Sequence, residues 1–195
     1  MKGRTLFSRW QSRASFNRLR SLGVELAADV TLYGMPIVSL ADASRISIAS
    51  RVVLCSESEQ TALGVSRPCI LRTLRPGAAI VIGAESGFSG TVICAAMSVS
   101  VGRECLFGVD VLIADTDFHP LKAAGRRHSD NVDDIAAAPI VIGDNVFIGA
   151  RSMILKGVQV GENSVIGAGS IVASDIPPNV VAAGVPARVL RDLPT

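Results

Sequence analysis

A six-residue repeat dominates the C-terminal part of this chain. From Ile142 the sequence reads IGDNVF, IGARSM, ILKGVQ, VGENSV, IGAGSI and VASDIP, which are six hexads without interruption. Each hexad opens with Ile or Val, and its fifth place holds a small or β-branched residue. Because side chains alternate across a strand, the fifth residue of one hexad and the first residue of the next point to the same face. Each junction therefore predicts a short strand, with Val146 and Ile148 facing inward and Phe147 between them facing outward.

The middle of each hexad is suited to a corner, because GDN, GEN and GAG tolerate turn conformations. Three such steps close a triangular coil, and stacked coils satisfy one another's backbone hydrogen bonds. The same pattern starts at Ile82, starts again one residue out of phase at Val101, and is weaker between Leu40 and Val53. Hydrophobic residues make up 49% of the chain but aromatic residues only 4%, which favours the narrow interior of a solenoid. A β-sandwich with chance spacing is the alternative that six consecutive matches disfavour.

The pattern breaks after Ile113. Continued by its own period, the next inward pair is Asp117 and His119. A carboxylate and an imidazole are costly to bury without partners, so we expect the chain to leave the coil here. The repeat resumes after an excursion at about 119–139, and loops of this length are usually functional or disordered. The break is the predicted functional site.

Four segments carry a resemblance to a known family: LGVSRPCILRTL, SGFSGTVICAA, DTDFHP and IPPNVVAAGVPARVLR. The chain resembles the hexapeptide-repeat acyltransferases over roughly residues 30–193, and within them bacterial O-acetyltransferases that act on sugars of surface polysaccharides. The resemblance implies an all-β fold: a left-handed parallel β-helix with an N-terminal helical segment, the excursion loop and a short C-terminal closing segment. It also implies acetyl transfer from acetyl-CoA to a sugar hydroxyl.

By this resemblance His119 is the general base, which takes the proton of the acceptor hydroxyl as that hydroxyl attacks the thioester. A neutral imidazole near pH 7 suits this task, and no covalent enzyme intermediate is expected. Asp117 and Asp115 are candidates to orient His119 or to contact the acceptor, or one of them caps the loop turn. Ser89 and Phe147 are candidate acceptor contacts, at places where relatives often hold Asn and Trp.

The resemblance also implies that the coenzyme lies in a groove between two subunits of a homotrimer. Ala150 and Ala168 match backbone contacts of the coenzyme, and their spacing of eighteen residues independently stacks them on one corner. Arg191 and, more weakly, Arg188 match basic residues that reach the coenzyme phosphates, as guanidinium groups do well.

One departure from the family concerns the cation near those phosphates. Relatives often have Thr-Lys before DIPPN, where this chain has Ala173 and Ser174. Ser174 is the candidate coenzyme contact at that place, and Arg151 or Lys156 from a neighbouring coil are the candidate replacements for the missing lysine.

The first 25 residues form a separate basic segment ahead of a β-helix domain at 26–195. Residues 4–22 predict a helix with Leu6, Trp10 and Ala14 along one side, joined by Phe7 and Leu19. Such a helix can cap the open end of the solenoid, which we favour, or contact a membrane surface peripherally.

Other features bound the location and the partners. The net charge of +2 is not that of a nucleic-acid-binding protein. There is no long apolar run and no signal peptide, so we expect a cytoplasmic protein, with the inner face of the membrane as an option. The four cysteines show no zinc spacing, so no metal is expected and the thiols are interpreted as small buried hydrophobes.

Rival functions differ in the residues that they require. A γ-class carbonic anhydrase uses the same solenoid but needs three His ligands for zinc, and this chain has only His119 and His128. An N-acetyltransferase of an amino sugar or nucleotide sugar remains open, because the same base serves both acceptors. Acetylation of serine or of simple galactosides and a non-catalytic β-helix scaffold also remain open. The sequence does not name the acceptor sugar.

Overall fold

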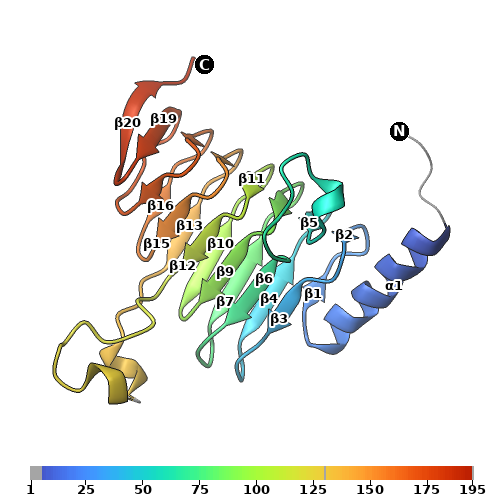
Figure 1. Ribbon diagram of the computed structural model, residues 1–195, viewed down its shortest axis with the longest axis horizontal. Helices are drawn as coiled ribbons and strands as arrows, with labels where there is room; N and C mark the ends of the chain where they lie inside the picture. Colours follow the sequence, from blue (N-terminus) through green and yellow to red (C-terminus); the bar gives the residue numbers. More distant parts are fainter. Residues whose placement is uncertain (1–5, 130, 195) are drawn as a thin grey trace.

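The chain winds into a three-sided β-helix (Figure 1). The computed structural model describes residues 6–129 and 131–194, and residues 6–12 by their backbone alone. Successive strands alternate among three sheets, here called A, B and C, and every pairing between coils is parallel except the last, between β19 and β20. Each sheet therefore forms one side of a prism, and three kinds of corner, A–B, B–C and C–A, form its edges.

The strands are short, as the hexads predict. Sheet A contains β1 (Glu25–Leu26), β4 (Arg45–Ile48), β7 (Ala79–Ile82), β10 (Ser98–Val101), β13 (Ile140–Ile142) and β16 (Gln159–Val160). Sheet B contains β2 (Thr31–Tyr33), β5 (Val53–Cys55), β8 (Gly87–Ser89), β11 (Leu106–Val109), β14 (Phe147–Ile148), β17 (Val165–Ile166), β19 (Val180–Gly184) and β20 (Ala187–Asp192). Sheet C contains β3 (Ile37–Ser39), β6 (Ile70–Thr73), β9 (Val92–Ala95), β12 (Leu112–Ala114), β15 (Met153–Leu155) and β18 (Ile171–Val172).

The interior follows the predicted hexad pattern. The opening residues of the six C-terminal hexads are all buried, and so are their fifth residues, including three serines. The serine hydroxyls donate to backbone oxygens: Ser152 to Gly167 at 3.0 Å, Ser164 to Pro177 at 2.7 Å and Ser170 to Gly167 at 2.6 Å. A hydroxyl in an aliphatic core is tolerated when it is hydrogen-bonded, which explains why the repeat accepts serine at its fifth place.

The phase of the repeat that starts at Ile82 is wrong in one place. The pattern predicts Phe88 and then Cys94 as inward residues, but the structure buries Phe88 and Ile93 and leaves Cys94 half-exposed. Between them Gly90 adopts a φ of +59°, a left-handed conformation that glycine reaches without a steric penalty, and the corner turns one residue early. The interpretation of all four cysteines as buried therefore fails for Cys94 and holds for the other three.

The N-terminal helix α1 (Leu6–Ser21) packs beside β1 and β2 at one end of the stack (Figure 1). Leu19 is fully buried there, Phe16 packs against the same core, and Arg20 donates to the backbone oxygen of Leu26 at 3.1 Å. These contacts agree with the predicted cap. Ala14, predicted on the packed side, is exposed, and the predicted Leu6, Phe7 and Trp10 contacts and residues 4–5 lie outside what the structure describes.

At the opposite end, the antiparallel hairpin of β19 and β20 extends sheet B and forms the predicted closing segment (Figure 1). No helix in the described part of the chain is both long enough and apolar enough to span a bilayer.

Candidate functional site

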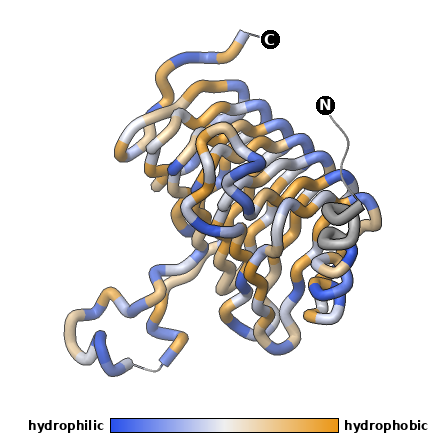
Figure 2. Tube along the Cα trace, turned by 45° about the vertical axis from the view of Figure 1, so that its right-hand side comes forward, coloured by the Kyte–Doolittle hydropathy of each residue, from blue (hydrophilic) through white to orange (hydrophobic). Residues whose placement is uncertain are grey.

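The predicted break opens at the C–A edge. β12 ends at Ala114, and an excursion of residues 115–139 with two short 3₁₀ turns, η2 (Arg126–His128) and η3 (Val132–Asp134), projects from the coils (Figure 2). It starts at 115, four residues before the predicted start. Its two strands meet in a short antiparallel neck, where the Asp117 N–H donates to the Ala136 oxygen at 3.0 Å and the Ala138 N–H donates to the Asp115 oxygen at 2.9 Å.

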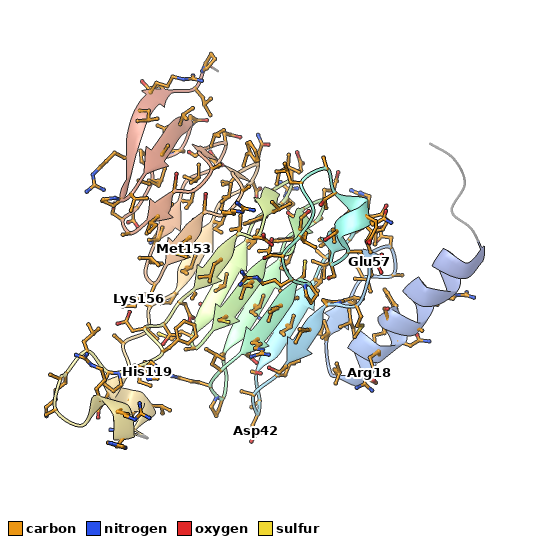
Figure 3. All side chains as sticks on the ribbon, in the orientation of Figure 1. Arg18, Asp42, Glu57, His119, Met153 and Lys156 are labelled. Atoms are coloured by element: carbon orange, nitrogen blue, oxygen red, sulfur yellow. The ribbon has the colours of Figure 1, made fainter. Side chains whose placement is uncertain are left out.

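His119 lies just beyond this neck. Its side chain is exposed, so the structure keeps the imidazole out of the core slot that the period assigns to it. Figure 3 shows it where the excursion leaves the coils, and also labels Lys156, which pairs with Asp117 of the same neck. The expectation that neither Asp117 nor His119 is an interior residue is confirmed.

Asp115 is fully buried and anchors the root of the excursion. Its Oδ1 accepts from the Ala96 N–H at 2.6 Å and its Oδ2 from the Met97 N–H at 2.7 Å, both at the C–A corner of the preceding coil. Burial raises the pKa of Asp115, and the same backbone amides oppose that rise. Both oxygens are thus engaged by backbone amides of the preceding coil, so Asp115 holds a corner of that coil instead of capping its own loop turn.

Asp117 is held differently. Its Oδ1 accepts from Lys156 Nζ at 2.7 Å, in a pair whose side chains are 20% and 33% exposed respectively. Its Oδ2 is buried and has no hydrogen-bond partner among the described residues. This leaves one open acceptor two residues from His119. It also pairs the ammonium group of Lys156 with Asp117.

The predicted coenzyme contacts lie on another edge, the B–C corner. The Gly169 N–H donates to the Ala150 oxygen at 2.8 Å, which stacks Ala150 and Ala168 one coil apart as their spacing predicts. An ideal Cβ on Gly149 would lie only 2.4 Å from the Ala168 nitrogen, so the two coils touch here through bare backbone. A cavity of about 390 Å³ opens at this edge, lined by Leu63, Val109, Ala150, Arg151, Ala168 and Gly169.

A second excursion reaches this cavity, and the sequence reasoning missed it. Residues 56–69 leave the B–C corner between β5 and β6 and include the 3₁₀ turn η1 (Ser58–Gln60). The sequence carries one signal for this excursion. Fourteen residues separate Cys55 from Ile70, whereas a single hexad would be enough to span the corner.

The remaining candidates lie on sheet B and at the C-terminal end. Ser89 ends β8 and is half-buried, and Phe147 stands on the outer face of β14 with 45% of its surface exposed. Arg188 and Arg191 are exposed on β20, and among the described residues their guanidinium groups donate to the backbone oxygens of the adjacent Ala187 and Asp192 respectively. Ser174 is exposed at the C–A corner that follows β18.

One chain does not bring these groups together. His119 follows the end of a sheet C strand, whereas Ala150 and Ala168 precede the starts of sheet C strands. The width of sheet C, about 10–13 Å of extended chain, separates the two edges. Within residues 6–129 and 131–194, no cluster of three or more His, Cys, Asp or Glu side chains is arranged to hold a metal ion.

The outer face of sheet C carries an apolar column. Ile37, Ile70, Val92, Leu112, Met153 and Ile171 are aligned by the strand register, one above the other. Ile37 and Met153 are the most exposed of them, at 43% and 41%. The column runs between the two edges that carry the candidate site.

Comparison with known proteins defines the class. The sequence model described as "Hexapeptide repeat of succinyl-transferase" matches residues 139–174. A solved hexapeptide-repeat-containing acetyltransferase of Vibrio cholerae is 30% identical, with a TM-score of 0.54, over 65% of this chain and 71% of that chain. The chain belongs to the hexapeptide-repeat acetyltransferases, and its fold is the all-β left-handed β-helix that the family resemblance implies.

Two further relatives are galactoside acetyltransferases. The galactoside O-acetyltransferase of Escherichia coli is 47% identical over 96 residues, which are 49% of this chain and 45% of that protein, so the match spans less than half of the relative. A galactoside acetyltransferase solved in complex with coenzyme A is 25% identical with a TM-score of 0.53, over all of this chain and 86% of that one.

Proposed function

We propose that this protein transfers an acetyl group from acetyl-CoA to a hydroxyl of a sugar, with His119 as the general base. The observation that carries the proposal is the exposed imidazole at the neck of the 115–139 excursion, in a chain whose B–C corner is a regular stack of backbone amides. The galactoside relatives supply the substrate class, a sugar, and the coenzyme complex supplies the donor.

Acetyl-CoA supplies the acetyl group as a thioester. His119 accepts the proton of the acceptor hydroxyl, whose oxygen bonds to the acetyl carbon as the C–S bond breaks, and the imidazolium returns the proton to the departing thiolate. The open Oδ2 of Asp117 is the group best placed along the chain to accept from the ring and fix its tautomer, while Lys156 holds the other oxygen of that carboxylate. Asp117 is thus proposed as a positioning residue and Asp115 as the anchor of the neck.

The coenzyme is proposed to run along the B–C edge, with backbone contacts at Ala150 and Ala168. Arg188, Arg191 and Ser174 are the proposed groups for its nucleotide end, and Arg151 is the cation in place of the missing lysine, because Lys156 is paired with Asp117. Ser89 and Phe147 are proposed to line the acceptor.

A homotrimer completes this arrangement. The apolar column of sheet C offers each copy a face to pack against the next, and burial of such a face stabilises association. Packing of that kind brings the C–A edge of one copy to the B–C edge of another, which joins the base to the coenzyme. A cytoplasmic location fits the four free thiols, and contact of the N-terminal segment with the inner face of the membrane is the remaining option for lipid-linked acceptors.

The test is acetyl-CoA consumption with a panel of galactosides, nucleotide sugars, amino sugars and lipid-linked glycans. Hydroxylamine then separates the products, because it cleaves O-acetyl esters and leaves N-acetyl amides intact. A hydroxylamine-labile product supports the proposal. A stable product selects the N-acetyltransferase alternative, and the absence of turnover with intact coenzyme binding favours the scaffold.

A further inference from the structure

The excursion of residues 56–69 is fixed along the B–C edge. Ser58 closes it across its base, since the Ser58 hydroxyl donates to the Val65 oxygen at 2.9 Å. The Ser66 N–H donates to Asp110 Oδ1 at 3.0 Å, which ties the excursion to the corner of a later coil. Gly90 lies beneath it, where an added Cβ would be 2.7 Å from Asp110 Oδ1 and 3.0 Å from the Arg67 oxygen. These contacts hold the excursion against the B–C edge, where it forms a wall.

Leu63 lies at the far end of this wall. It lines the cavity of about 390 Å³ together with Ala150 and Ala168, although its own strand ends at Cys55, several coils away along the edge. Its side chain is 76% exposed, so the contacts it makes within this chain leave most of its apolar surface free. An aliphatic group is thus held over the corner where the coenzyme is proposed to bind.

The chemistry of the cavity distinguishes between the two halves of coenzyme A. Leu63, Val109 and the two alanines offer apolar surface and a backbone corner, and Arg151 is the cation on the lining. The pantetheine arm has methyl and methylene groups between two amides, which match such a surface. The nucleotide end carries three phosphates and calls for several cations.

We propose that Leu63 is a specificity-determining contact for the pantetheine arm of the donor, supplied by the same chain that carries Ala150 and Ala168. This inference rests on the proposed function. Leu63 acts on donor binding and touches none of the reacting groups at His119. The cavity volume lies within the range of small-molecule sites.

The test compares Leu63→Ser with Leu121→Ser, a matched leucine on the other excursion that is 71% exposed. Titration calorimetry on the full chain measures coenzyme A, which has the pantetheine arm, and adenosine 3′,5′-bisphosphate, which lacks it. We expect Leu63→Ser to weaken coenzyme A about tenfold, the loss of one buried leucine side chain, and to leave the bisphosphate unchanged. Leu121→Ser is expected to change neither, and Leu63→Met to retain most of the affinity.

Equal coenzyme A affinity in Leu63→Ser and the unaltered protein would overturn the inference, as would an equal loss for both ligands. Failure of the unaltered protein to bind coenzyme A would instead overturn the proposed function itself. Since Leu63 is exposed, the serine variant is expected to unfold at the same temperature as the parent, which calorimetric melting verifies.

Discussion

The C–A edge at the 115–139 excursion and the B–C corners of the C-terminal coils differ in how closely they follow the six-residue repeat. At the C–A edge the repeat fails: a carboxylate and an imidazole fall where aliphatic residues are due, and the chain leaves the coil on a neck anchored by the buried Asp115. At the B–C corners of the C-terminal coils the repeat persists, and Ala150 and Ala168 stack with backbone against backbone. The contrast suggests a division of labour under the proposed function. The excursion that leaves the repeat presents the reactive side chain, whereas the regular corners present a uniform row of backbone amides to the long coenzyme.

The largest effect is expected from a substitution at the C–A edge. His119→Ala should lower kcat by on the order of 10²–10⁴-fold, because it removes the general base. The side chain is exposed, so the melting temperature and the affinity for coenzyme A should not change. His128→Ala, in η2 of the same excursion, is the matched control and should retain activity. Undiminished turnover in His119→Ala would contradict the catalytic role proposed for the C–A edge.

The next largest effect is expected from a substitution at the B–C corner of the C-terminal coils. Gly149→Ala adds a Cβ that would lie only 2.4 Å from the Ala168 nitrogen, so the two coils must separate. We expect a loss of about 3 kcal/mol in the free energy of unfolding, the upper range of overpacking because the obstructing atoms are backbone. Chemical denaturation measures it, and coenzyme affinity should fall in parallel.

Gly87→Ala is the control for this loss, since its nearest contact would be an ordinary 3.8 Å from the Leu106 side chain. A Gly149→Ala protein as stable as Gly87→Ala would show that the close stacking of the B–C corner is not required.

A smaller effect tests the anchor of the irregular edge. Asp115→Asn keeps one carbonyl oxygen for the Ala96 and Met97 amides and turns an NH₂ group toward the other amide. An unsatisfied buried amide costs about 2 kcal/mol, which denaturation should detect. Asp110→Asn can keep its single bond to Ser66 and should cost much less. Equal stability of the two variants would contradict the anchoring role of Asp115.

The sequence predicts the regular C-terminal coils well and the irregular parts of both edges only in part. Inward residues follow from period six, and the eighteen-residue spacing predicts the Ala150–Ala168 stack, because identical steps build identical corners. The phase after Phe88 fails, since Gly90 shortens a corner in a way that spacing does not record. Asp115 was not recognised as an anchor because its partners are backbone amides of another coil.

The contacts of the second excursion and the Lys156–Asp117 pair were likewise beyond sequence reasoning, although the length of the gap marks the excursion itself. Both join residues that are distant in sequence, and only the stacking of coils brings them together. The separation of His119 from the coenzyme corner follows from the order of sheets, which the hexads do not specify.

The central claim is that the base and the coenzyme corner of a working site come from different copies of this chain. Co-purified mixtures of His119→Ala with Ala168→Trp, each carrying a different affinity tag, test it most directly. Each variant alone should be inactive, while in every trimer that contains both variants one of the three sites pairs an intact base with an intact corner and should regain activity. Mixed assemblies as inactive as either parent would contradict the claim and place the whole site within one chain.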